Sequence, residues 1–189
     1  MKILSLHCDY IKFKPLKKAL NEPEELNESQ KKEKEVKESL VIFIAVEKQD
    51  ESNPSVVLQL TKEIEDIAKQ VNAKNIVLYP YAHLSPSLSK PQFALDTLKS
   101  AEKELMKNKK FSITRAPFGY YKEFELKCKG HPLAELSREI NIGEKSAKDI
   151  QPQRIISSNE TIDYKQLLRE ISKSKLDTSK LKENDHRII

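Results

Sequence analysis

The sequence has little glycine, little cysteine and no tryptophan: three of its 189 residues are glycine and two are cysteine. With so few glycines, the chain has neither a glycine-rich phosphate-binding loop nor a Gly-x-Ser-x-Gly nucleophile motif. Cys8 and Cys128 have no spacing typical of a disulfide framework, so we expect reduced thiols. Apolar runs with the length of a transmembrane helix or the form of a signal peptide are also lacking, which predicts a cytoplasmic protein without a membrane partner.

The composition bounds the size of the core and the kind of partner. Apolar residues make up 38% of the chain and charged residues 33%, which is enough for one modest core with long solvated segments. The length fits one large domain, or one domain with an additional segment. The net charge of +5 is compatible with a nucleic-acid partner but does not require one.

Strand and helix periods alternate along the first two thirds of the chain. We expect strands at 3–8, 41–46, 75–79 and 111–114, and helices at 57–71 and 91–105. This order predicts an α/β fold whose helices form parallel crossover connections. Residues 11–40 hold eight lysines and seven glutamates, which predicts a solvated surface segment or a mobile insertion.

Two of the three glycines, Gly119 and Gly130, flank a segment with strand alternation. Alternation places Lys122 on an otherwise apolar face, with Phe124, Leu126 and Cys128. Such a lysine either snorkels, with its stem buried and its ammonium in water, or serves as a catalytic or anion-holding amine in a pocket. Spacing alone favours snorkelling.

The residues after Gly130 predict a short helix. Pro132 suits a first helical turn, and Leu133, Leu136 and Ile140 then recur at helical spacing. Glu135 would lie in that first turn, where a carboxylate complements the helix dipole.

Two histidines, His83 and His131, are candidates for a functional role. His83 follows a predicted strand, in a position that suits either a structural hydrogen bond or a functional role. Cys128 and His131 have Cys-x-x-His spacing, but zinc needs four converging ligands. Cys128 shares the apolar face of its strand, so a packed core thiol is the better interpretation and we expect no metal.

Three motifs together resemble the N-terminal editing domain of archaeal threonyl-tRNA synthetase. They are Tyr-Pro-Tyr-Ala-His-Leu-Ser at 79–85, Ala-Pro-Phe-Gly-Tyr-Tyr-Lys at 116–122, and Lys-Gly-His-Pro-Leu-Ala-Glu-Leu-Ser-Arg at 129–138. The His-Cys-Asp-Tyr at 7–10 and the Val-Glu-Lys at 46–48 fit the same family. The resemblance covers residues 1–142. The polar residues 143–189 read as a linker toward a synthetase catalytic module, whose first residues the segment 185–189 resembles.

The resemblance implies a D-aminoacyl-tRNA deacylase-like fold, a two-layer α/β domain with a central β-sheet and packed helices that forms a homodimer. The implied activity is hydrolysis of serine attached wrongly to the threonine tRNA, by a water molecule and with help from the terminal 2′-hydroxyl of the tRNA. Lys122 and His83 would be catalytic. The pocket would be completed by Tyr121, Glu135 and the backbones of Ala82 and Val46.

The same resemblance implies that editing needs no cofactor, and that ATP and zinc belong to the catalytic module. Two alternatives stay open at this stage. The chain could be a D-aminoacyl-tRNA deacylase, which differs in the stereoisomer that the pocket admits, or a tRNA-binding appendage without catalytic activity.

Overall fold

The computed structural model describes residues 1–141, so the predicted linker at 143–189 lies outside the described residues. Six strands form one sheet: β1 (Lys2–Lys18), β2 (Lys34–Ala45), β3 (Asn75–Pro80), β4 (Ser112–Arg115), β5 (Tyr120–Cys128) and β6 (Glu135–Glu139). The helices are α1 (Val56–Gln70) and α2 (Pro91–Met106), with short 3₁₀ turns η1 (Lys48–Ser52) and η2 (Ala82–Leu84).

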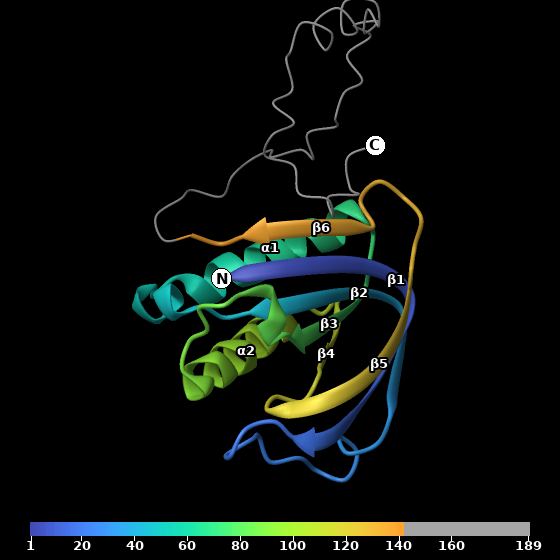
Figure 1. The fold of residues 1–189 in the computed structure, drawn as a ribbon. Coiled ribbons are helices and arrows are strands. Elements are labelled where there is room, and N and C mark those ends of the chain that lie inside the picture. The colour runs from blue at the N-terminus through green and yellow to red at the C-terminus, as the bar shows by residue number, and fades with distance from the viewer. Residues whose placement is uncertain (142–189) are drawn as a thin grey trace, which may run out of the picture. The chain divides into compact units, whose positions relative to one another are not determined.

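The long strand β1 organises the sheet (Figure 1). One edge of β1 pairs antiparallel with β2, and the other edge pairs first with β6 and then with β5. Beyond β2, the strands β3 and β4 continue the sheet in parallel. The helices α1 and α2 provide the two crossovers, so the predicted parallel connections are confirmed.

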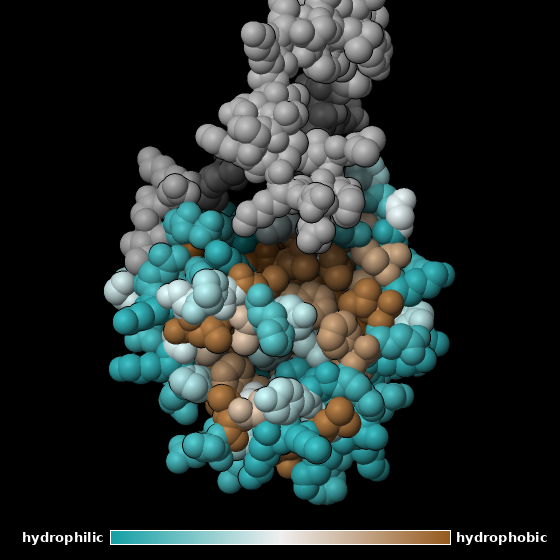
Figure 2. Space-filling model, in the orientation of Figure 1, coloured by the Kyte–Doolittle hydropathy of each residue, from teal (hydrophilic) through white to brown (hydrophobic). Residues whose placement is uncertain are grey.

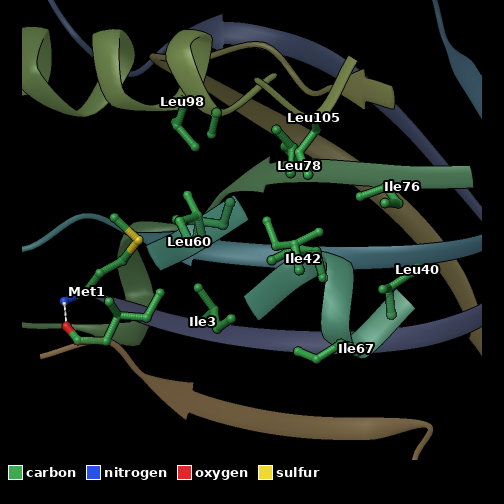
Figure 3. Packing of buried hydrophobic residues seen from close by; sticks show 14 of the residues in the cluster. Met1, Ile3, Leu40, Ile42, Leu60, Ile67, Ile76, Leu78, Leu98 and Leu105 are labelled. Carbon is green, nitrogen blue, oxygen red and sulfur yellow. Dashed lines mark hydrogen bonds between the residues drawn. The ribbon is translucent and has the colours of Figure 1, made fainter. Parts of the chain in front are cut away.

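The two helices cover one face of the sheet and enclose the main core (Figure 3). The predicted helical periods bury Leu60, Ile64 and Ile67 of α1 and Leu98 and Leu105 of α2. They pack against alternate residues of the strands, namely Ile3, Leu40, Ile42, Ile44, Ile76 and Leu78. Each such side chain stabilises the fold by about 1.5–3 kcal/mol when it leaves water. Within residues 1–141, neither helix is long and apolar enough to cross a membrane.

The prediction of a solvated segment at 11–40 was wrong at both of its ends. β1 continues to Lys18 and β2 begins at Lys34, so only residues 19–33 lie between the strands. The charged side chains here alternate with buried Ile11 and Phe13, because one face of the extended strand is apolar and the other is solvated. The strand-period signal is hard to see because β1 carries a bulge after Cys8, which shifts the alternation by one residue.

The predicted helix after Gly130 is instead a turn followed by strand β6. Residues 135–139 pair with Lys2–Leu6 of β1. The apolar residues fit both periods, because Ala134, Leu136 and Ile140 are also spaced by even numbers and all three are buried. The free edge of β1 decides between them, since pairing there satisfies the backbone of both segments. Glu135 is therefore not at a helix N-terminus.

Candidate functional site

The sheet face opposite the helices carries a second apolar cluster that no helix covers among residues 1–141. Its buried members are Cys8, Ile11, Phe13, Val41, Phe43, Val77, Tyr79 and Ala116. In the orientation of Figure 1 the helices lie behind the sheet, and Figure 2 shows apolar side chains gathered on the side toward the viewer. Phe124 of β5 lies over this cluster with its ring 5.5 Å from that of Tyr79, yet is 43% exposed. We call this surface the open face.

The ends of β2 and β3 meet at one edge of the open face. Val46 follows β2, and Ala82 and His83 follow β3, so parallel pairing brings their backbones to the same end of the sheet. The Tyr81 amide donates to the Ile44 carbonyl at 2.8 Å, which ties the two ends together. The exposed His83 ring packs edge-on against Tyr81, with centroids 5.2 Å apart.

A buried polar network fixes this edge. The Ser85 hydroxyl donates to Glu47 Oε1 at 2.5 Å, and the Met1 ammonium lies 3.1 Å from Glu47 Oε2 and 2.8 Å from Asp50 Oδ1. Burial alone would raise the pKa of Glu47, but the hydrogen bonds from Ser85 and Met1 outweigh burial and hold the pKa below its ordinary value. A charged, fully bonded carboxylate therefore holds the turns that carry Val46 and Ala82.

Lys122 projects onto the open face, as the alternation predicted. Its Nζ donates to the carbonyls of Pro117 at 3.0 Å and Tyr120 at 3.1 Å, and lies 5.1 Å from the centre of the Tyr79 ring. An ammonium has three donors. Among the residues that the structure describes, these two carbonyls are its only hydrogen-bond acceptors, so one donor is available to a ligand.

Two opposing effects set the pKa of Lys122. Burial disfavours the ammonium and lowers the pKa of Lys122 to about 8, while the charge of Glu24 acts in the opposite direction. At neutral pH the side chain is therefore protonated in most molecules, but it can lose its proton within the range in which many enzymes work. The snorkelling interpretation fails, because the Nζ is held against backbone carbonyls and an aromatic ring rather than in bulk water.

The other predicted pocket residues lie further from the Lys122 ammonium. Tyr121 is 63% exposed, and alternation directs it to the other side of β5. Glu135 is on the open-face side of β6 but pairs with Leu6, whereas Lys122 pairs with Pro15 near the opposite end of β1. Within one chain, Lys122 therefore lies on the cluster that includes Tyr79, and His83 lies at the rim of that cluster. Tyr121 and Glu135 lie apart from the Lys122 ammonium.

Cys128 and His131, which have the Cys-x-x-His spacing, contact other side chains. His131 meets His7 instead, with 2.8 Å between His131 Nε2 and His7 Nδ1, and Cys128 Sγ lies 4.0 Å from Glu135 Oε1. Residues 1–141 contain no group of three or more His, Cys, Asp or Glu side chains arranged to hold a metal ion. Both cysteines are free thiols, and Cys8 is fully buried.

Three residues near Lys122 were missed by the sequence reasoning. Tyr79 supplies the ring beneath the ammonium, and Glu24 and Arg115 form a buried ion pair beside it. Tyr79 carried a signal, because it ends a predicted strand in the motif that includes His83. Glu24 and Arg115 carried none, because nothing in their local sequences connects two residues so far apart along the chain.

The architecture resembles that of a solved structure, the c-Myc DNA Unwinding Element Binding Protein. The TM-score is 0.53 at 10% sequence identity, and the match covers 75% of this chain and 99% of that chain. At this identity the likeness concerns the fold alone. Together with the six-stranded sheet and its packed helices, it confirms the predicted α/β fold.

Curated relatives are far more similar in sequence. A threonine–tRNA ligase of Thermococcus sibiricus is 48% identical over 165 residues, covering 87% of this chain and 26% of the relative. The ligase of Thermococcus gammatolerans is 52% identical, and that of Methanosphaera stadtmanae 50% identical, each over 141 residues that cover 74% of this chain and 22% of the relative. This chain thus spans about a quarter of the length of these relatives.

A family model matches residues 1–140, and its description is the archaea-specific editing domain of threonyl-tRNA synthetase. Editing of an aminoacyl-tRNA is hydrolysis of its ester, so the predicted enzyme class is confirmed at the level of the family. The match covers nearly all of the described residues, including Lys122, His83 and the turns that carry Val46 and Ala82. The chain belongs to the family of archaea-specific editing domains of threonyl-tRNA synthetase.

Proposed function

We propose that this chain hydrolyses L-seryl-tRNA(Thr), the product of mistaken serine attachment to the threonine tRNA. Serine is threonine without one methyl group, and a hydrophobic contact of that size discriminates only about 10–200-fold. A second site that destroys the serine product supplies the remaining accuracy. An editing domain among relatives named threonine–tRNA ligase fits this need.

The observation that carries the proposal is the available donor of the Lys122 ammonium. Two of its three donors are fixed by the carbonyls of Pro117 and Tyr120, so the third has a set direction before substrate arrives. A preorganised cationic donor stabilises the oxyanion that forms when water attacks an ester carbonyl, or holds that water. We propose this role for Lys122.

A water mechanism also fits the state of the thiols. Burial raises the pKa of Cys8 to about 12, and burial raises the pKa of Cys128 as well. Both thiols are therefore protonated at neutral pH, and a protonated thiol is a weak nucleophile. We assign the attack to water, with the 2′-hydroxyl of the terminal tRNA nucleotide assisting, and we assign no cofactor to this step.

The remaining residues have proposed binding roles. The backbones of Val46 and Ala82, at the end of β2 and β3, would hold the seryl group, and His83 would orient it by hydrogen bonds. Tyr121 and Glu135 would contact the substrate at points further from Lys122. ATP and zinc would serve the catalytic module of a threonyl-tRNA synthetase. The cytoplasm, where tRNA is charged, is the proposed location.

A second copy of this chain is the proposed occupant of the open face. A homodimer would cover part of the apolar cluster and could bring Glu135 of one copy toward Lys122 of the other. We expect light scattering at micromolar concentration to give the mass of a dimer. A monomer at this concentration would contradict the homodimer without bearing on the hydrolysis.

Replacing His83 by alanine is expected to slow editing by about tenfold, less than the loss of Lys122. The imidazole is exposed and packs edge-on against Tyr81, which suits orientation of the substrate better than transfer of a proton. The measurement is the single-turnover rate of the His83→Ala variant between pH 5.5 and 8. A wild-type rate that depends on pH in this range, and a dependence that disappears in His83→Ala, would make His83 a general base instead.

The substrate is tested by a panel of charged tRNAs. We expect the chain to deacylate L-seryl-tRNA(Thr) and to spare L-threonyl-tRNA(Thr). Rapid hydrolysis of D-aminoacyl-tRNA, with L-seryl-tRNA(Thr) left intact, would favour the D-aminoacyl-tRNA deacylase. Binding of every charged tRNA without hydrolysis would favour the non-catalytic appendage.

A further inference from the structure

A buried ion pair lies next to the turn that precedes Lys122. Arg115, the last residue of β4, donates from Nη1 and Nη2 to the two oxygens of Glu24 at 2.7 and 2.6 Å. Its Nε donates to Glu102 of α2 at 2.7 Å. The side chains of Arg115 and Glu24 are only 7% and 6% exposed. Bidentate pairs of this kind are among the strongest ion pairs that arginine forms. This pair joins the β1–β2 connection, which carries Glu24, to strand β4 of the sheet.

Glu24 also bonds to the turn itself. The Phe118 amide donates to Glu24 Oε2 at 3.1 Å, and the Tyr120 hydroxyl donates to the Glu24 carbonyl at 2.9 Å. Between them Gly119 has a φ of 82°, and a Cβ there would lie 2.9 Å from Cα of Pro23. The turn and the segment that carries Glu24 therefore pack backbone against backbone.

The same turn holds the Lys122 ammonium. The carbonyls that accept from Nζ belong to Pro117 and Tyr120. These two residues flank Phe118 and Gly119, which contact the segment around Glu24. A shift of the turn would therefore move both acceptors at once. The titratable groups that face the ammonium are Glu24 from the β1–β2 connection and Tyr79 from β3, and Arg115 of β4 acts on it through Glu24.

We propose that Glu24 and Arg115 are positioning residues for the reaction: their ion pair holds the 117–120 turn, and through it the direction and charge of the Lys122 ammonium. The opposing interpretation is a purely structural ion pair, because breaking any buried pair destabilises a fold. The two interpretations differ in what they predict for Lys122 in a variant that remains folded. The effect on catalysis rests on the proposed function, whereas the effect on the titration of Lys122 does not.

The test uses Glu24→Gln in the full chain. The amide keeps the size and an acceptor oxygen for Phe118 but removes the charge. Lys122 is titrated by competitive labelling with acetic anhydride at a series of pH values, followed by peptide mass spectrometry. We expect the midpoint for Lys122 to move to lower pH than in the wild type, and the single-turnover rate on L-seryl-tRNA(Thr) to fall about 10–100-fold, with KM nearly unchanged.

The chain offers a control of the same chemistry. Arg138 of β6 donates to Glu63 of α1 at 3.1 Å, on the helix side of the sheet near the opposite end of β1. Glu63→Gln should leave both the labelling midpoint of Lys122 and the rate at wild-type values. If Glu24→Gln does not fold, Tyr120→Phe removes only the bond to the Glu24 carbonyl and should reduce the rate in the same direction, by a smaller factor.

The outcomes separate this inference from the proposed function. A folded Glu24→Gln variant with the wild-type labelling midpoint and the wild-type rate would overturn the positioning role. A wild-type chain that fails to deacylate L-seryl-tRNA(Thr) would overturn the proposed function, and the labelling experiment would still decide whether Glu24 controls Lys122.

Discussion

Replacing Lys122 by methionine is expected to leave the domain folded and to slow hydrolysis of L-seryl-tRNA(Thr) about 10²–10³-fold, or roughly 3–4 kcal/mol in transition-state free energy. Methionine keeps most of the length and apolar packing of the stem above Tyr79, but it has no donor. The two carbonyls that held the ammonium can turn to water. The loss should therefore appear in the rate constant of the single-turnover reaction, with the tRNA still bound.

Two further variants sharpen this result. Lys122→Arg should also fail, because a planar guanidinium cannot replace a compact ammonium between the carbonyls of Pro117 and Tyr120. Lys127→Met makes the same change on the outer side of β5, where Lys127 is exposed and pairs with Asp9 at 3.1 Å, and should be harmless. If folded Lys122→Met hydrolyses the ester at nearly the wild-type rate, the chemistry lies elsewhere on the domain.

The same substitution is expected to make the domain more stable at neutral pH. Burial lowers the pKa of Lys122 from 10.5 to about 8. Below pH 8 the ammonium is charged in both the folded and the unfolded chain, and the folded chain bears the whole cost of burying it. Between pH 8 and 10.5 the folded chain gives up a proton that the unfolded chain retains, so the free energy of unfolding rises with pH in this window.

Each unit of pKa corresponds to about 1.4 kcal/mol, so the change from 10.5 to about 8 sets an upper limit of about 3.5 kcal/mol on the stability that Lys122→Met gains at pH 7. The gain should shrink as the pH approaches 10. Urea unfolding of both proteins at pH 7, 8.5 and 10 measures the difference. Gain of stability with loss of activity is the expected signature of a charge kept for function. If Lys122→Met is instead less stable than the wild type by the same amount at every pH, the contacts of the ammonium with the two carbonyls and Tyr79 offset the whole cost of burying its charge.

Much of the fold followed from local patterns. The run at 41–46 is apolar throughout, because β2 is covered by helices on one face and by aromatic side chains on the other. The helical periods in α1 and α2 predicted the faces that are buried. Lys122 was placed on the correct face by alternation alone, because β5 is regular from Lys122 to Leu126.

The errors have a common physical cause. A strand is stabilised by the neighbour with which it pairs, and the neighbour is invisible in a local pattern. Residues 135–139 contain spacings that suit a helix, and only the free edge of β1 makes them a strand. The far end of β1 was hidden by lysines that alternate with Ile11 and Phe13, and by the bulge that precedes them.

The candidate site was predictable only in part. Lys122 and His83 stand out by residue type and position, whereas the roles proposed for them came from the family resemblance. The Glu24–Arg115 pair, the Tyr79 ring and the network around Glu47 depend on contacts between distant segments. The ion pair and the ring lie near the Lys122 ammonium, and the Glu47 network holds the turns that carry Val46 and Ala82, so these surroundings could not be read from the sequence by itself.

The pH dependence of single-turnover deacylation tests the central claim most directly, namely that a protonated Lys122 on the open face drives hydrolysis. L-seryl-tRNA(Thr) would be incubated with excess protein between pH 6 and 9.5, and the spontaneous rate subtracted. We predict a rate that falls as the pH rises through about 8, the pKa of Lys122, and a Lys122→Met variant without this fall. A rate that instead rises through the same range would make the neutral amine a base and contradict the account.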